Sequence, residues 1–205
     1  MTTTIAIILS MVTGYLLGSI PFALVIGKVF FKTDIRNFGS KNLGGGNAGR
    51  VLGKKAGLAV MTMDILKVTL AIFLASLFGQ GEIPMILAGL GAAAGHCFPL
   101  FAHFKGGKAV ATMYGFLFGM GLFGGYGLIL FFFPLLVFLL VLYIWKIIAL
   151  ASICSAAAIT VFVFVTTGSV PMTVTLLIFT VLMIIRHKKN IQRMINHEEN
   201  KISWM

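Results

Sequence analysis

Charged residues are scarce in this chain of 205 residues, and acidic ones are the scarcest. Only 10% of the residues are charged, and five Asp or Glu stand against sixteen Lys or Arg, while 59% are hydrophobic. A soluble domain of this size cannot hide that much apolar surface, because most of its surface faces water. The composition therefore excludes a soluble globular protein and predicts an integral membrane protein, for which lipid is the natural solvent.

Cysteines are also few. Cys97 and Cys154 are the only two, and both lie in or beside apolar segments. Neither a disulfide framework nor a metal-binding spacing can be built from them. We expect both to be small packing residues, and we expect neither a metal nor a cofactor.

Sequence signals of several other protein classes are missing. No basic residue precedes the apolar stretch from Ile5 to Phe31, which is also too long for a signal peptide, so we expect a retained membrane helix. The chain has no internal repeat of the kind common in secondary transporters. It also has no GxSxG motif, which argues against a serine nucleophile.

The net charge of +11 raises the question of a nucleic-acid partner. The basic residues are separated by apolar runs of membrane length rather than gathered in one patch, so we expect no nucleic-acid binding. A bias of Lys and Arg toward cytoplasmic loops explains the charge instead.

The apolar runs predict an all-α polytopic membrane protein with seven helices in a single domain, residues 1–205. The expected spans are 4–27, 56–78, 84–102, 109–123, 126–145, 147–167 and 171–186. The stretch from Ala109 to Trp145 is too long for one crossing, and five glycines interrupt it between positions 119 and 127. We therefore place a turn there.

The loops between these spans alternate between rich and poor in Lys and Arg. Seven basic residues follow the first span, two follow the third, one follows the fifth and five lie at or after the end of the seventh. The loops after the second, fourth and sixth spans carry none. The positive-inside rule then predicts an N-terminus outside and a C-terminus in the cytoplasm.

The loop from Gly39 to Lys55 reads GSKNLGGGNAGRVLGKK. Its glycines let the backbone approach a ligand, and Arg50 supplies a planar fork that suits phosphate oxygens. Neutral polar groups come from Ser40, Asn42 and Asn47. The same composition is typical of a flexible loop that faces anionic lipid headgroups, and composition alone does not separate the two.

A second glycine-rich loop, Lys105-Gly106-Gly107-Lys108, superficially resembles a P-loop. The P-loop spacing is absent and no strand precedes it, so a phosphate nest with Lys108 as a point charge fits better. His96 lies at the end of the third expected helix. It either bonds a neighbouring helix or is functional, because ionisable groups at that depth are functional by default.

Other polar groups lie within or just after the apolar segments. Asp64 and Lys67 are three residues apart on one helix face, which predicts a structural ion pair, with catalysis by Asp64 as the alternative. We expect Ser152 to bond a carbonyl of its own helix. His187 and Asn190 share a face if the seventh helix continues, where they either bond a phosphorylated ligand or face the surface.

Taken together, these residues resemble the acyl-phosphate:glycerol-3-phosphate acyltransferase family, the integral-membrane first acyltransferases of bacterial phospholipid synthesis. The resemblance covers nearly the whole chain. The matching motifs are Gly18-Ser19-Ile20-Pro21, Asp34-Ile35-Arg36, Gly39-Ser40-x-Asn42, Asn47-x-x-Arg50-Val51-Leu52-Gly53-Lys54, Asp64-x-x-Lys67, Gly95-His96-x-x-Pro99, Phe104-Lys105-Gly106-Gly107-Lys108, Ala111-Thr112 and Arg186-His187-x-x-Asn190-Ile191-x-Arg193.

The resemblance implies seven helices in the bacterial inner membrane, with an active site that faces the cytoplasm. It implies transfer of a fatty acyl group from acyl phosphate to the 1-hydroxyl of glycerol 3-phosphate, which gives lysophosphatidate and phosphate. The expected partners are these two substrates, membrane lipids and the peripheral enzyme that makes acyl phosphate.

Residue roles follow by similarity. The expected phosphate-binding residues are Ser40, Asn42, Asn47, Arg50, Gly106, Gly107 and Lys108. The expected glycerol 3-phosphate-binding residues are Ser152, His187 and Asn190, and the supporting residues are Asp64, Lys67 and His96. Because acyl phosphate carries a good leaving group, we expect no protein nucleophile, and the proton passes to a substrate phosphate or to His187.

The chain departs from the family pattern at a few positions. The departures are Gly44-Gly45-Gly46-Asn47 for GATN, Ala109 for the last glycine of GGKG, Ala149 for a serine and Lys41 for a glycine. The Cβ of Ala109 lies where the backbone needs to approach phosphate. Besides an active acyltransferase, two alternative functions remain open. The chain is either a diverged paralogue of low activity or a non-enzymatic transporter of a phosphorylated metabolite.

Overall fold

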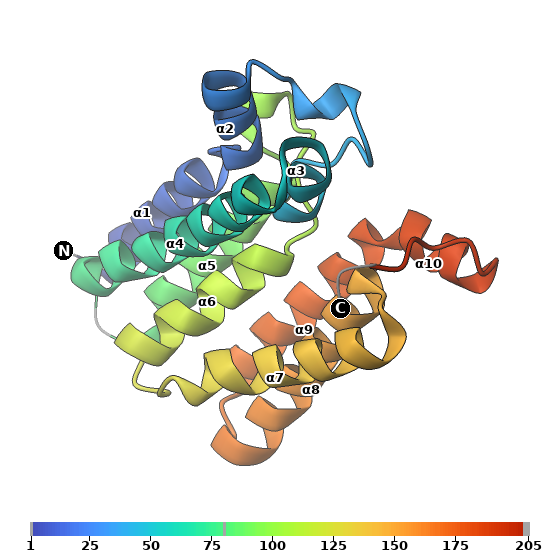
Figure 1. Ribbon diagram of the computed structural model, residues 1–205. Helices are drawn as coiled ribbons and strands as arrows, with labels where there is room; N and C mark the ends of the chain where they lie inside the picture. Colours follow the sequence, from blue (N-terminus) through green and yellow to red (C-terminus); the bar gives the residue numbers. More distant parts are fainter. Residues whose placement is uncertain (1, 80, 203–205) are drawn as a thin grey trace.

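The computed structural model describes residues 2–79 and 81–202, and every regular element in these ranges is helical (Figure 1). The α-helices are α1 (Thr3–Gly18), α2 (Phe22–Phe31), α3 (Gly45–Leu52), α4 (Lys54–Phe78), α5 (Glu82–Cys97), α6 (Val110–Phe123), α7 (Ile129–Trp145), α8 (Ile148–Thr167), α9 (Val170–Arg186) and α10 (Lys188–Ile195). Two short 3-10 helices are η1 (Ile35–Asn37) and η2 (Leu100–Ala102).

The protein is a polytopic membrane protein, as its composition predicts. By length and composition, four helical stretches can cross a membrane, namely Thr3–Phe31, Lys54–Phe78, Glu82–Ala102 and Ile148–Thr167. The pair α9 and α10, bent by 62°, is a fifth candidate, while α6 and α7 are shorter apolar helices. All seven expected apolar segments are thus helical, and they differ in length more than the sequence suggests.

The first expected helix, residues 4–27, is interrupted. Helix α1 ends at Gly18 and α2 begins at Phe22, with Pro21 between them. Proline has no N–H to continue the ladder of hydrogen bonds, so the chain changes direction there. The carbonyl of Ile20 at this break accepts a hydrogen bond from Nζ of Lys67 at 2.9 Å. The same carbonyl accepts the N–H of Phe22 at 3.1 Å, so a charged side chain of α4 adds a second hydrogen bond to the backbone at the break.

Helices α1 and α5 pack closely through glycines. A Cβ added at Gly14 would lie 2.1 Å from the carbonyl oxygen of Ala88, and one added at Gly18 would lie 2.2 Å from that of Ala92. Small residues of this kind let membrane helices associate by close backbone contact. The packing fixes the position of α5, whose C-terminal end carries His96.

The predicted turn between the fourth and fifth expected helices is confirmed. Helix α6 ends at Phe123 and α7 begins at Ile129. Gly125 and Gly127 between them have φ of 79° and 76°, in the left-handed region that favours glycine. The two apolar segments are therefore separate helices.

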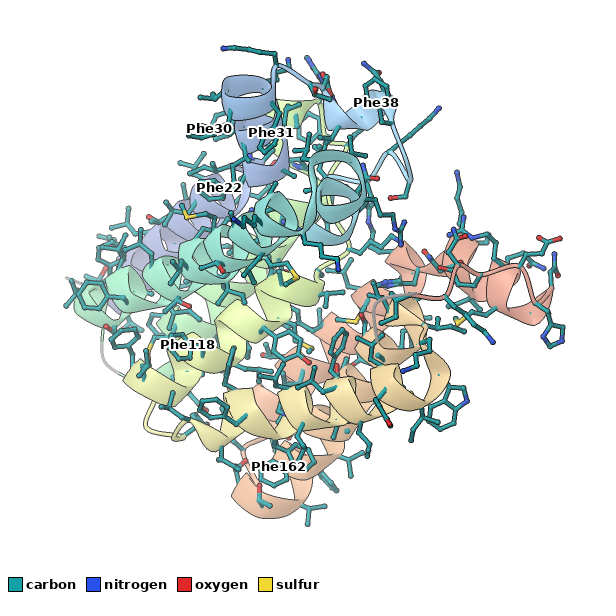
Figure 2. The ribbon with its side chains drawn as sticks, viewed as in Figure 1. Phe22, Phe30, Phe31, Phe38, Phe118 and Phe162 are labelled. Carbon is teal, nitrogen blue, oxygen red and sulfur yellow. The ribbon has the colours of Figure 1, made fainter. Side chains whose placement is uncertain are left out.

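The helices present apolar side chains outward. Phe164 is 66% exposed and Val165 is 73% exposed, both on α8. Figure 2 shows Phe30, Phe31 and Phe38 together at the end of the molecule that α2 and η1 form. An outward surface of this kind is suited to lipid and unsuited to water.

The polar loops gather at one end of the helical bundle. Helices α3 and α10 lie at this end, near the loop that joins α5 to α6 (Figure 1). The first glycine-rich loop leads into α3, and the tail continues from α10. Segments that are up to about 150 residues apart in the sequence therefore meet there.

Candidate functional site

A cavity of about 790 Å³ lies among these loops. It is walled by residues of η1 and the loop after it, by the loop between η2 and α6, and by the end of α9 with α10. The lining residues are Arg36, Asn37, Ser40, Lys41, Asn42, His103, Phe104, Lys105, Gly106, Lys108, Arg186, Lys189, Asn190 and Arg193. None of them is acidic, so the cavity is suited to an anion.

Lys108 and Asn190 are in contact at this cavity. Nζ of Lys108 donates a hydrogen bond to Oδ1 of Asn190. The amide Nδ2 of Asn190 donates in turn to Oε1 of Glu199 at 2.6 Å. Nε of Arg193 donates to the other oxygen of Glu199, also at 2.6 Å. The tail carboxylate thus fixes which way the Asn190 amide faces, and its oxygen faces Lys108.

The electrostatic surroundings of Lys108 favour its neutral form. Burial lowers the pKa of its amine to about 8, the attraction of Glu199 opposes this shift, and the positive charges of Arg193, Arg50 and Arg186 add to it. Burial is the largest cause of the shift, and the repulsion by the three arginines is a smaller one. A bound phosphate would remove the repulsion.

The loop from Lys105 to Lys108 is held from two sides. The N–H of Gly107 donates to the carbonyl of His96 at 2.9 Å. Arg186 donates from Nε to the carbonyl of Gly107 and from Nη2 to that of Gly106, both at 2.9 Å. A Cβ added at Gly107 would lie 2.0 Å from Nε2 of His96. The glycine is needed for this close approach, and its N–H already has an acceptor within the protein.

The predicted ion pair between Asp64 and Lys67 is confirmed, and His96 joins it. Nζ of Lys67 lies 2.7 Å from Oδ1 of Asp64 and 3.2 Å from Nδ1 of His96. All three side chains are buried. Since Lys67 also bonds the carbonyl of Ile20, the cluster joins the α1–α2 break, α4 and α5 to the back of the Gly107 loop. None of the three lines the cavity.

In the first glycine-rich loop, two of the predicted residues line the cavity and two do not. Ser40 and Asn42 are in its wall. Asn47 is buried and accepts from the N–H of Ser40 at 2.8 Å, while its Nδ2 donates to the carbonyls of Ile35 and Phe38. Asn47 therefore braces the loop. Arg50 is exposed at the end of α3 and acts on Lys108 through its charge.

Of the three residues predicted to bind glycerol 3-phosphate, one lines the cavity and two do not. Asn190 lines the cavity, whereas Ser152 and His187 are buried outside its wall. Oγ of Ser152 donates to the carbonyl of Ile148 at 2.8 Å, the bond expected within its own helix. The Nδ1 atom of His187 lies 2.8 Å from the carbonyl of Met183, so the proton on that atom leaves Nε2 as the acceptor.

His187 occupies the bend between α9 and α10. Because the two helices meet at 62°, the seventh helix does not continue straight into the tail. Burial and the charge of Lys108 lower the pKa of the His187 imidazole to about 4. The ring is therefore neutral at neutral pH.

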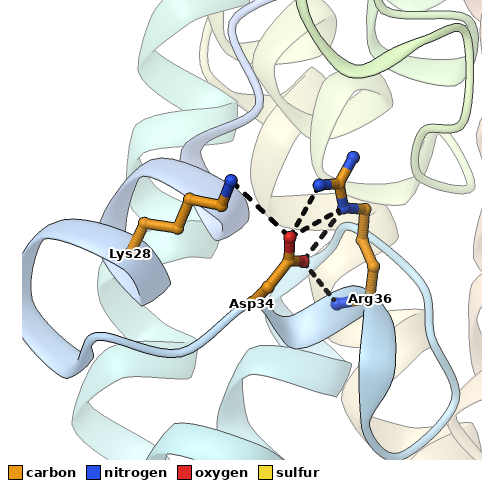
Figure 3. Close-up of polar contacts among 3 residues, drawn as sticks. All are labelled: Lys28, Asp34 and Arg36. Atoms are coloured by element: carbon orange, nitrogen blue, oxygen red, sulfur yellow. Dashed lines mark hydrogen bonds and ion pairs between the residues drawn. The ribbon is translucent and has the colours of Figure 1, made fainter.

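Several charged residues of this region, among them Arg36, Arg186 and Glu199, were not assigned to the site from the sequence. Arg36 lines the cavity and is bonded to Asp34, as Figure 3 shows. Arg186 binds the glycine loop, and Glu199 binds Asn190. A sequence signal exists for the two arginines, since Arg36 follows Asp34 at a spacing of two and Arg186 directly precedes His187. The sequence gives no sign of where the tail carboxylate lies.

Comparison with known proteins agrees with this geometry. The family model described as glycerol-3-phosphate acyltransferase matches residues 8–197. The chain is 42% identical over 207 residues to the glycerol-3-phosphate acyltransferase of Enterococcus faecalis, with 97% of this chain and 93% of that one covered. It is 44% identical over 202 residues to that of Geobacillus kaustophilus, with 96% of each chain covered.

Two solved structures share the fold. The crystal structure of PlsY (YgiH), an integral membrane glycerol 3-phosphate acyltransferase, matches in its glycerol 3-phosphate form with a TM-score of 0.87 and 34% identity. Its lysophosphatidic acid form matches with a TM-score of 0.84 and 33% identity, and both matches cover 96% of this chain and 95% of the other. The chain therefore belongs to the glycerol-3-phosphate acyltransferase family, as an integral membrane acyltransferase of phospholipid synthesis.

Proposed function

We propose that the acyl donor is acyl phosphate and that the acyl group goes to the 1-hydroxyl of glycerol 3-phosphate. The products are 1-acylglycerol 3-phosphate, which is lysophosphatidate, and inorganic phosphate. The observation that carries the proposal is the cationic cavity in which Lys108, from the glycine loop before α6, meets Asn190, from α10. Both substrates and both products carry phosphate, so a cavity lined by Lys and Arg without acidic residues suits each of them.

The donor phosphate lies against the first glycine-rich loop and Lys108. Ser40 and Asn42 supply neutral donors from the cavity wall, and Lys108 supplies a positive charge beside them. Arg50 adds to the local positive potential, because its charge already acts on Lys108. Gly106 belongs to the same wall, and glycine is required there because a Cβ would lie 2.0 Å from the carbonyl oxygen of His96.

The acceptor lies on the α9–α10 side. Asn190 faces the cavity and contacts Lys108, so it can bond the phosphate or a hydroxyl of glycerol 3-phosphate. His187 lies three residues before Asn190 with Nε2 as an acceptor, and Ser152 is the buried hydroxyl of α8. We assign these three residues to acceptor binding, with glycerol 3-phosphate reaching past the cavity wall to His187 and Ser152.

The reaction needs no covalent enzyme intermediate. The hydroxyl oxygen of glycerol 3-phosphate attacks the acyl carbon, the bond from that carbon to the phosphate oxygen breaks, and phosphate leaves with the electron pair. The hydroxyl proton goes to a phosphate oxygen or to neutral His187. Holding two phosphates close together and stabilising the charge on the leaving group account for the rate.

The protein takes the donor from the cytoplasmic side of the bacterial plasma membrane. The basic loops and the tail form the end of the molecule that contains the cavity, and the positive-inside rule assigns such loops to the cytoplasm. The acyl chain stays among membrane lipids. The peripheral enzyme that makes acyl phosphate is then a partner on the same face.

An assay with defined donors tests the proposal. Purified protein in detergent is given glycerol 3-phosphate with acyl phosphate, acyl-CoA or acyl carrier protein, and lysophosphatidate is measured together with released phosphate. We expect product with acyl phosphate alone, with one phosphate released for each acyl group transferred. Equal or greater turnover with a thioester donor would refute acyl phosphate as the donor. No product with any donor would favour a paralogue that has lost activity.

A further inference from the structure

Arg36 is a cavity residue to which neither composition nor resemblance gives a role. It belongs to η1, between the α2 helix and the first glycine-rich loop. Its side chain is 30% exposed and lies in the same cavity wall as Ser40 and Asn42. Lys108 and Asn190 reach that cavity from other segments. The arginine therefore faces the space in which we place the phosphates.

The guanidinium is held in one orientation by Asp34. Nε of Arg36 donates to Oδ1 at 2.9 Å and Nη2 donates to Oδ2 at 2.6 Å (Figure 3). Oδ1 of Asp34 also accepts the backbone N–H of Arg36 at 3.1 Å. The remaining nitrogen of the guanidinium has no contact with Asp34 in Figure 3. It keeps its donors for another group.

The cluster around Asp34 has a net positive charge. Nζ of Lys28 lies 3.6 Å from Oδ2 of the same carboxylate, so one negative charge faces two positive ones. The hydrogen bond from Arg36 lowers the pKa of Asp34 to about 2, which keeps the carboxylate ionised at any physiological pH. The ion pair of Asp34 and Arg36 therefore stays intact. Because the single carboxylate is shared by two cations, the charge of Arg36 is only partly neutralised.

The backbone beneath Arg36 is rigid. Ile35 is fully buried, and its carbonyl accepts a hydrogen bond from Nδ2 of Asn47 at 3.1 Å. Asn47 also holds the carbonyl of Phe38 and the N–H of Ser40. A fork that is held in place by its neighbours loses little freedom when it binds an anion.

We propose that Arg36 is a further phosphate-binding residue that holds the phosphoryl group of the acyl donor, and that Asp34 is a positioning residue that acts through it. The donor is chosen over the acceptor because Arg36 shares its wall with Ser40 and Asn42, whereas Asn190 belongs to α10. This assignment rests on the proposed function. The competing explanation is an ion pair that only stabilises the loop.

Three variants separate these explanations. Arg36→Gln removes the charge, Arg36→Lys keeps the charge without the fork, and Lys32→Asn is the charge-matched control. Lys32 is exposed, lies outside the cavity wall and has a φ of 51°, a conformation that asparagine tolerates. For Arg36→Gln we expect the KM for acyl phosphate to rise roughly 10-fold or more, with less than about 2-fold change in the KM for glycerol 3-phosphate. The KM of Arg36→Lys for acyl phosphate should lie between those of the wild type and Arg36→Gln. The KM of the Lys32→Asn control should match that of the wild type.

Asp34→Asn tests the positioning role. We expect a rise of roughly 3-fold in the donor KM when it is made alone, because the fork is no longer held. In the Arg36→Gln background the same change has no further effect. An equal loss in both backgrounds would show that Asp34 acts through the fold and would overturn its role.

Binding of inorganic phosphate is measured separately from turnover, as the rise in melting temperature of the detergent-solubilised protein. Arg36→Gln weakens this protection and Lys32→Asn does not, whether or not acyl phosphate is the donor. Unchanged protection by phosphate, or a change confined to glycerol 3-phosphate kinetics, overturns the assignment. If the wild-type protein makes no lysophosphatidate from acyl phosphate but is still protected by inorganic phosphate, the proposed donor is refuted and the phosphate-binding role of Arg36 is not.

Discussion

Burial lowers the pKa of the Lys108 amine to about 8. A phosphate dianion binds the charged amine and not the neutral one. We therefore expect the KM for acyl phosphate to increase as the pH rises through 8. The substrates do not cause this change, because the second pKa of a phosphate monoester is about 6. Once phosphate is bound its charge keeps Lys108 protonated, so kcat stays nearly constant over the same range.

The size of the effect follows from the pKa. An amine with a pKa of about 8 is roughly nine-tenths charged at pH 7 and roughly one-tenth charged at pH 9. If only the charged form binds, the KM rises about 10-fold between these two pH values. The protein does not lose stability from Lys108 over that range. Between 8 and 10.5 the unfolded chain keeps the proton that the folded chain has released, so this group makes the free energy of unfolding increase with pH.

The measurement is steady-state kinetics with varied acyl phosphate from pH 6.5 to 9.5. Lys108→Arg is the control, because a guanidinium stays charged throughout and its profile has no break near 8. If that variant is inactive, protection of both proteins by inorganic phosphate against thermal unfolding reports the same break. A wild-type KM that is flat up to pH 9 would refute the lowered pKa or the role of Lys108 in binding.

Three other expectations follow from the structure. Ala109, where the family has glycine, is fully buried outside the cavity wall with a φ of 62°. Ala109→Gly relieves a strain of about 1 kcal/mol, so it should raise the melting temperature and leave the donor KM unchanged. A lower donor KM in this variant would show that the methyl hinders phosphate binding. Arg50→Ala should lose most activity, by roughly 30- to 1000-fold, in a protein that melts normally; near-native turnover would remove that charge from the site. A cysteine placed at Gly81 should react with an impermeant thiol reagent on intact cells while one at Lys54 should not, and the reverse result would invert the topology.

Most of the helices could be predicted from the sequence because lipid imposes a simple rule. A run of apolar residues must bond its own backbone, so it becomes a helix. Glycines at 125 and 127 marked the turn between α6 and α7 for the same local reason. The break at Pro21 was missed because the residues on both sides are apolar, and the group that stabilises it, Lys67, lies 47 positions from the Ile20 carbonyl that it bonds.

The site was harder to predict because its contacts are remote in sequence. Asn47 in a glycine-rich loop is as well suited to a ligand as to a backbone carbonyl, and only the positions of Ile35 and Phe38 decide that it braces the loop. Asn190 was found by resemblance, yet its orientation depends on Glu199 in the tail. Nothing in the local sequence indicates that the tail returns to this cavity.

In the glycine loop before α6, glycine is required for packing within the protein rather than for contact with phosphate. Gly107 is required because a Cβ would strike the ring of His96, and its N–H is already bonded to the His96 carbonyl. Arg186 takes up the carbonyls of Gly106 and Gly107. A loop whose backbone groups are satisfied in this way is rigid before any ligand arrives, so the ordering cost is met on folding rather than on binding. Direct recognition of phosphate then depends chiefly on side chains, with Lys108 at the end of the loop held where the charge is needed.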